Sequence, residues 1–212
     1  MISASAAVAA AVSVAEEHGV RVREPVVLKD SFNLRIHLRP APIVARVPTV
    51  TALGRPRPAD VLRRELDVVS YLHGVGVPVV PPSELLPPGP HLRDGVVVTF
   101  WAYVEHDPAY EVSPEEAGRA LAELHEAMRG FPGELPYLGP VLDEPATMLD
   151  GRAAVRAYGA DPDDPGLRDF LAARGLQGTL WMLVRALRFP AEAGTARTAL
   201  DAWLRDPSGA TR

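Results

Sequence analysis

The chain has 212 residues, of which 47% are hydrophobic and 23% charged, and its net charge is −5 at pH 7. These proportions are typical of a globular protein of one large domain or two small lobes, and the interspersed charges do not favour a general binder of nucleic acid or anionic membranes. The sequence contains no cysteine, which excludes disulfides, thiolate catalysis and cysteine-ligated zinc.

The first fifteen residues are rich in alanine, valine and serine. No lysine or arginine precedes Arg21, so the positively charged start of a signal peptide is missing. The segment instead predicts a helix that ends near Gly19. No apolar stretch approaches the length of a membrane span. We therefore expect a cytoplasmic protein with no membrane partner.

Three short segments of β character follow, at residues 25–28, 34–38 and 43–47. Their close spacing predicts an antiparallel meander. Residues 60–73 carry apolar side chains at a period close to 3.6, which predicts a helix that ends at Gly74 and Gly76. The continuous apolar run at 96–104 predicts a strand that is covered on both faces.

The rest of the chain predicts helices. Ser113-Pro114-Glu115-Glu116 is a capping box that predicts the start of a helix ending near Met128. After a connection rich in proline and glycine at 130–145, helices are predicted at 153–158, from about 165, and at 191–204. The run 180–184 is apolar on all sides, so we expect it to be deeply buried. The change from β-rich to helical sequence near Glu105 predicts two lobes, at 1–104 and 105–212.

Two charged residues interrupt these apolar patterns. Arg46 lies within the apolar strand 43–47, and Glu65 lies on the same side of its helix as Val61, Val68 and Leu72. A charge that faces a core is costly unless an opposite charge meets it, so Arg46 and Glu65 could pair. The alternative, which the pattern leaves open, is that both lie at partly exposed edges and form no more than a weak surface pair.

The order of these features resembles the nucleotide-binding lobe of the protein-kinase-like fold. More narrowly, the chain resembles the aminoglycoside phosphotransferase family, whose members phosphorylate small molecules. The stretches that carry the likeness are residues 31–33, 43–47, 64–66, 76–79, 97–104 and 121–125. The resemblance covers most of residues 20–130 and implies an α+β fold of two lobes, with an antiparallel sheet and one helix in the first lobe and helices in the second.

The resemblance also implies a nucleotide site in the first lobe, with ATP as its cofactor. In such enzymes a strand cation grips the phosphates and a helix glutamate holds the cation; here these would be Arg46 and Glu65. Arginine in place of lysine is a departure, because a guanidinium binds phosphate with a different geometry. Residues 30–33 would form the turn over the phosphates, although they lack the glycines that permit close backbone approach. The remaining cofactor-binding residues that the resemblance implies are Ser31 and Asn33 in that turn, and Phe100, Trp101 and Tyr103 beside adenine.

The catalytic residues of the family are missing from the sequence. Phosphoryl transfer in this fold needs an aspartate in a His-x-Asp loop, an asparagine that follows it, and a further aspartate for magnesium. No His-x-Asp occurs, and Asn33 is the only asparagine. His91-Leu92-Arg93-Asp94 resembles such a loop but precedes the strand at 96–104, and it predicts a hairpin turn. We therefore assign no catalytic and no metal-binding residue, and expect magnesium only if other carboxylates replace the missing ones.

The carboxylates that could replace them are Asp143, Glu144, Asp150, Asp161, Asp163 and Asp164. They lie among prolines and glycines, which favours solvated loop or cap positions. The simplest interpretation is that a block between about Asp143 and Asp150 is missing relative to the family.

Four hypotheses remain open from the sequence. The protein could bind a nucleotide or small molecule without turnover, or work as a phosphotransferase with unconventional carboxylates. It could be a non-enzymatic interaction protein, with a partner or a second copy covering apolar surface of helices such as 180–187. It could also derive from a longer parent by an internal deletion.

Overall fold

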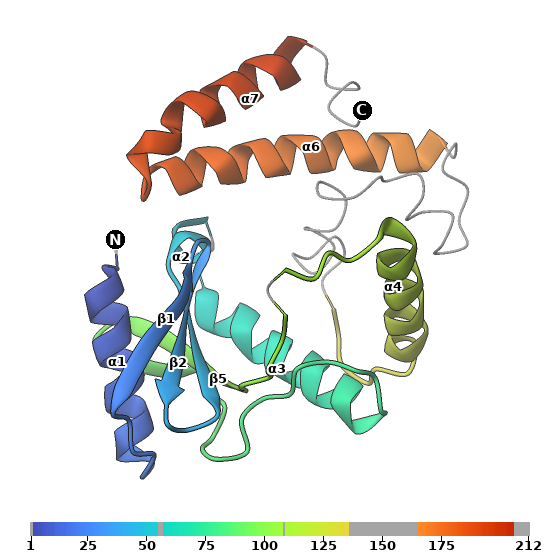
Figure 1. Ribbon diagram of the computed structural model, residues 1–212. Coiled ribbons are helices and arrows are strands. Elements are labelled where there is room, and N and C mark those ends of the chain that lie inside the picture. The colour runs from blue at the N-terminus through green and yellow to red at the C-terminus, as the bar shows by residue number, and fades with distance from the viewer. Residues whose placement is uncertain (1, 55–56, 108, 136–164, 206–212) are drawn as a thin grey trace. The chain divides into compact units, whose positions relative to one another are not determined.

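A computed structural model describes residues 2–54, 57–107, 109–135 and 165–205 (Figure 1). The chain forms two compact units, Met1–Asp107 and Pro108–Arg212, whereas the sequence places the boundary after residue 104. The first unit contains a five-stranded antiparallel sheet together with helices, and the α+β class is therefore confirmed.

The sheet has the strand order β1-β2-β3-β5-β4, and neighbouring strands are antiparallel. The first three strands form the predicted meander, and the strand predicted at 96–104 returns beside the third one. The bounds are β1 Glu24–Asp30, β2 Asn33–Arg39, β3 Ile43–Pro48, β4 His91–Arg93 and β5 Val96–Ala102.

One face of the sheet packs against helix α1, Ala4–Glu17. Alternate residues of a strand point to the same face, and β2, β3 and β5 each turn one alternating set of apolar residues toward α1. The helix contributes mainly alanines, whose small side chains let it lie close to the sheet. The buried residues of this layer are Ala7, Ala10, Ala11, Val14, Ala15, Leu34, Ile36, Leu38, Ile43, Ala45, Val47, Val96, Val98 and Phe100.

The opposite face of the sheet meets helix α3, Pro58–Gly74, which packs against β5. This is the helix predicted at 60–73. Its buried residues, Leu62, Leu66, Val68 and Leu72, follow the helical period. Residues 96–101 are all buried, which confirms that β5 is covered on both faces. A short helix that the sequence does not predict, α2 (Val50–Gly54), follows β3.

The segment that resembles a catalytic loop is part of a hairpin, as predicted. His91–Arg93 forms β4, and the turn to β5 lies at Asp94 and Gly95, with φ of 51° and 77°. Positive φ at both central positions is the geometry for which Asp-Gly is favoured in a two-residue hairpin turn.

The second unit contributes helices α4, Pro114–Met128, α6, Pro165–Ala186, and α7, Ala193–Arg205, with a 3-10 turn η3, Pro190–Glu192, between the last two. The capping box before α4 is present. The predicted helix at 153–158 and the candidate carboxylates between Asp143 and Asp164 lie outside the described residues.

The expectation that 180–184 is deeply buried is wrong. Leu180 is 48% exposed, residues 181–184 are only partly buried, and Leu187, just beyond α6, is 64% exposed. In the described part of this unit, α6 packs mainly against η3 and α7, and packing on one side cannot cover a helix that is apolar all round. A second copy over this surface stays a prediction. Among the helices of the described ranges we find none with the length and apolar character of a bilayer span.

Candidate functional site

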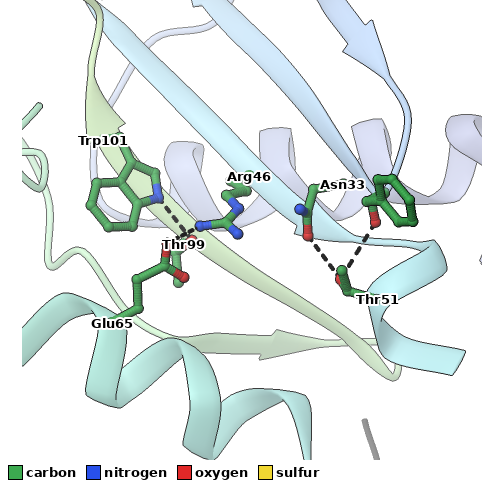
Figure 2. Close-up of polar contacts among 7 residues, drawn as sticks. Asn33, Arg46, Thr51, Glu65, Thr99 and Trp101 are labelled. Atoms are coloured by element: carbon green, nitrogen blue, oxygen red, sulfur yellow. Dashed lines mark hydrogen bonds and ion pairs between the residues drawn. The ribbon is translucent and has the colours of Figure 1, made fainter. Parts of the chain in front are cut away.

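Arg46 on β3 and Glu65 on α3 form an ion pair (Figure 2). The Arg46 Nη1 group donates to Oε1 of Glu65. The two side chains are 22% and 32% exposed, so the pair forms and is partly buried, with features of both alternatives that the sequence left open.

The strand and the helix each explain why the two charges meet. In β3, Ile43, Ala45 and Val47 point toward α1, so the alternation of the strand turns Arg46 to the other face. In α3, Glu65 lies beside the buried Leu66 at the edge of the apolar stripe. Because α3 packs on the face to which Arg46 points, each charge supplies the partner that makes partial burial of the other tolerable.

Thr99 and Trp101 lie next to this pair on β5. Thr99 is directly opposite Arg46 in the β3–β5 register, and Trp101 is opposite Val44. The Trp101 indole Nε1 donates to Thr99 Oγ1 at 3.0 Å, and both side chains are buried. Sequence reasoning did not single out Thr99, although counting back two residues from Trp101 places it on the same face.

Tyr103 lies on the Arg46 face, whereas Phe100 does not. The Tyr103 ring stacks on His37 with centroids 3.9 Å apart and planes 10° apart, and His37 is opposite Val44. Phe100 is fully buried in the layer against α1. The sheet therefore brings two of the three aromatic residues expected beside adenine to the Arg46 face and turns the third away.

The turn between β1 and β2 is tied to the chain that follows β3. The Phe32 carbonyl accepts hydrogen bonds from the Val50 and Thr51 N–H groups, each at 3.1 Å. The Thr51 hydroxyl donates to Asn33 Oδ1 at 2.8 Å. Ser31 is buried, so its side chain is not presented to solvent. These hydrogen bonds hold the conformation of the turn, which contains no glycine.

Asn33 presents its amide toward the Arg46 region. It begins β2 opposite Pro48, two residues before the position opposite Arg46, and therefore shares the face of Arg46. Figure 2 shows its amide oxygen on the side of Thr51 and its nitrogen on the side of Arg46. Of the two predicted turn residues, Asn33 thus contributes to the site surface and Ser31 does not.

The face that holds these residues suits an anion with an aromatic or apolar group beside it. Arg46 is oriented by Glu65, and the Asn33 amide is oriented by Thr51. Trp101 lies on β5 and Tyr103 just beyond its end. Within the described ranges, no group of three or more His, Cys, Asp or Glu residues could hold a metal ion.

Comparison of the chain with protein-family models, with curated proteins and with solved structures found no match. The functional inference therefore rests on the residues of the chain and their geometry.

Proposed function

We propose that residues 1–107 form a nucleotide-binding lobe of the protein-kinase-like type, similar to that of the aminoglycoside phosphotransferases, in a chain that binds ATP without transferring its phosphate. The observation that carries the proposal is the half-buried Arg46–Glu65 pair. Kinases of this type hold their phosphate-binding strand cation with a helix glutamate in the same way.

The order of the elements around the pair supports the same reading. Three antiparallel strands lead to α3, and the hydrophobic strand β5 then returns beside β3. The cation, the glutamate, and the aromatic side chains of Trp101 and Tyr103 come from different elements and lie around one face. A core alone does not need a charged pair at this position, since well-packed apolar side chains are often at least as stabilising.

We infer the lack of turnover from the sequence. Without a His-x-Asp loop and with Asn33 as the only asparagine, the chain lacks the groups that orient the acceptor hydroxyl and hold magnesium in such enzymes. ATP would therefore be bound as a ligand, and no step of chemistry is assigned to it.

Titration of the protein with ATP, followed by calorimetry and by the thermal unfolding midpoint, tests the proposal. Bound ATP at about 100 times its Kd should stabilise the folded state by about 2.7 kcal/mol. Arg46→Ala should abolish binding, and Arg46→Lys should keep much of it, since lysine also binds phosphate as a point charge. Arg63→Ala is the matched control, because Arg63 is an exposed cation of α3 that pairs with Asp60, three residues before it.

Arg46→Ala leaves Glu65 partly buried without its partner and will weaken the fold, so circular dichroism must show that the variant is folded at the temperature of the titration. Millimolar ATP that neither shifts the wild-type midpoint nor gives heat would overturn the proposal. ATP-dependent phosphate transfer to any small-molecule acceptor would overturn its second half and favour a working enzyme.

A further inference from the structure

Three cations form a row across the sheet on the face of the Arg46–Glu65 pair. In the β2–β3 register Arg35 is directly opposite Arg46, and in the β1–β2 register Lys29 is directly opposite Arg35. Residues opposite each other in antiparallel strands point to the same face, with Cβ atoms about 5 Å apart. The cation row therefore runs Lys29, Arg35, Arg46 and continues to Thr99 on β5.

An irregularity in β1 puts Lys29 into this row. Val27 is opposite Ile36, but the next paired residues are Lys29 and Arg35, so the register shifts between Val27 and Lys29. Without the shift, Leu28 would lie opposite Arg35, and Lys29 would lie opposite Leu34 on the α1 face. Bulges of this kind re-aim side chains and are frequent next to functional sites.

The row carries more positive charge than the ion pairs of the described residues neutralise. Glu65 pairs with Arg46, whereas Arg35 and Lys29 are exposed and have no ion pair within the described ranges. Asp30, the carboxylate next to Lys29 in the sequence, is opposite Leu34 and so belongs to the other face. Like charges directly opposite each other destabilise a sheet, and folding alone gives no reason to align three of them.

The row lies beside the turn that holds Asn33. Asn33 precedes Arg35 by two residues in β2 and shares its face. Its amide oxygen is taken by the Thr51 hydroxyl, and its amide nitrogen lies on the Arg46 side in Figure 2. One neutral donor thus lies on the same face as the three cations and on the side of Arg46, and all four groups are suited to phosphate oxygens.

We propose that Lys29, Arg35 and Arg46, with the Asn33 amide, bind a chain of linked phosphates. Neighbouring strands are about 4.8 Å apart, so the row spans two strand spacings. A triphosphate can meet all three cations, while a single phosphate meets one or two. The proposal rests on the nucleotide-binding function above, to which it adds Lys29 and Arg35 as the residues that select a polyphosphate tail.

Calorimetric titration of the full chain with tripolyphosphate, pyrophosphate, orthophosphate, ATP and adenosine tests this selection. Tripolyphosphate and ATP should bind more tightly than pyrophosphate, and orthophosphate most weakly. Lys29→Gln and Arg35→Gln should each raise the Kd of tripolyphosphate and of ATP about fivefold or more, as expected for loss of a charge-assisted contact. Arg23→Gln, which removes an exposed cation just before β1, should leave both values unchanged.

The only lysine of the chain is Lys29, which gives a second readout that needs no variant. An amine-reactive acylating reagent can modify only Lys29 and the terminal amine, and mass spectrometry separates the two. Saturating tripolyphosphate should slow acylation of Lys29 several-fold without slowing that of the terminal amine, and adenosine should not slow it. Unchanged Lys29 reactivity under saturating tripolyphosphate would overturn the proposal.

The two proposals fail in different ways. If ATP binds but Lys29→Gln and Arg35→Gln behave as Arg23→Gln does, the cation row is wrong and the nucleotide lobe stands. A different result would support the row and contradict nucleotide recognition. In that case tripolyphosphate binds and its binding depends on the row, whereas ATP binds no better than tripolyphosphate and adenosine does not bind. If neither tripolyphosphate nor ATP binds, both proposals are overturned.

Discussion

The environment of the Arg46 face changes the pKa of His37. Its ring is buried and stacks on Tyr103. Burial lowers the pKa of His37 from its ordinary value, and the nearby charge of Arg39 lowers it further, while a hydrogen bond with the Ala41 backbone acts in the opposite direction. A protonated imidazole at this position would lose hydration and lie close to another cation.

We expect His37 to be neutral in the folded protein at pH 7 and to resist protonation below its ordinary pKa of about 6.5. The unfolded chain binds a proton at that position more readily, so this residue makes the free energy of unfolding fall as pH drops below about 6.5. Two-dimensional NMR of the histidine rings, with the His37 signal assigned by its loss in His37→Gln, measures the pKa. A midpoint at or above the ordinary value would contradict the inferred environment.

Some residues of the site could be predicted from the sequence and others could not, for a physical reason. Arg46 and Glu65 stand out because each interrupts an apolar pattern, which is visible without a fold. Arg35 and Lys29 interrupt nothing, since β1 is largely exposed and Arg35 occupies an ordinary polar position of β2. Their alignment with Arg46 depends on strand register and on the shift in β1, and neither can be read from the sequence.

Among the elements, α4 begins with a complete capping box. Ser113 Oγ accepts the Glu116 N–H at 3.2 Å, and Glu116 Oε2 accepts the Ser113 N–H at 2.9 Å. The Tyr110 hydroxyl donates to Glu116 Oε1 at 3.0 Å. The bonds from Ser113, and then that from Tyr110, hold the pKa of Glu116 below its ordinary value. This carboxylate therefore stabilises the cap above its ordinary pKa, and the stabilisation is lost as pH falls through the lowered one.

Ser113→Ala should destabilise α4 by about 1 kcal/mol, because it leaves the Glu116 N–H in the first helical turn without its acceptor. Hydrogen exchange of the Glu116 and Ala117 amides should accelerate while the amides of the sheet stay unchanged. Ser70→Ala is the control, since Ser70 is an exposed serine within α3, where alanine is the better helix former. Equal effects of the two substitutions on α4 would show that the cap contributes nothing.

The elements were predictable where one pattern dominates. The meander, α3 and the capped α4 follow from spacing, period and capping residues, and all are present. The prediction that residues 180–184 of α6 are deeply buried was wrong, because an apolar run on all sides of a helix shows only that burial would be favourable. Whether the run is buried depends on how many elements surround the helix, which is a property of the tertiary structure.

For the molecule as a whole, the buried positions among the described residues are concentrated in the first unit. The hydrophobic core cluster lies entirely within Met1–Asp107. In the described residues of the second unit, the buried positions are Gly118, Thr179 and Ala196. Since buried apolar area is the main source of stability, the two units should open with different free energies.

Native-state hydrogen exchange should therefore show the slowest amides in β2, β3 and β5 and faster ones in α6 and α7. Ile36→Val removes a fully buried methylene and should cost about 1 kcal/mol, which accelerates exchange in the sheet about fivefold without changing α7. Ala196→Gly, at a buried position of α7 that is 1% exposed, should cost about 1 kcal/mol in the helix. It should accelerate exchange in α7 without changing exchange in the sheet. If each substitution accelerated exchange equally in both units, the chain would unfold as one cooperative body, and the division at residue 107 would have no energetic meaning.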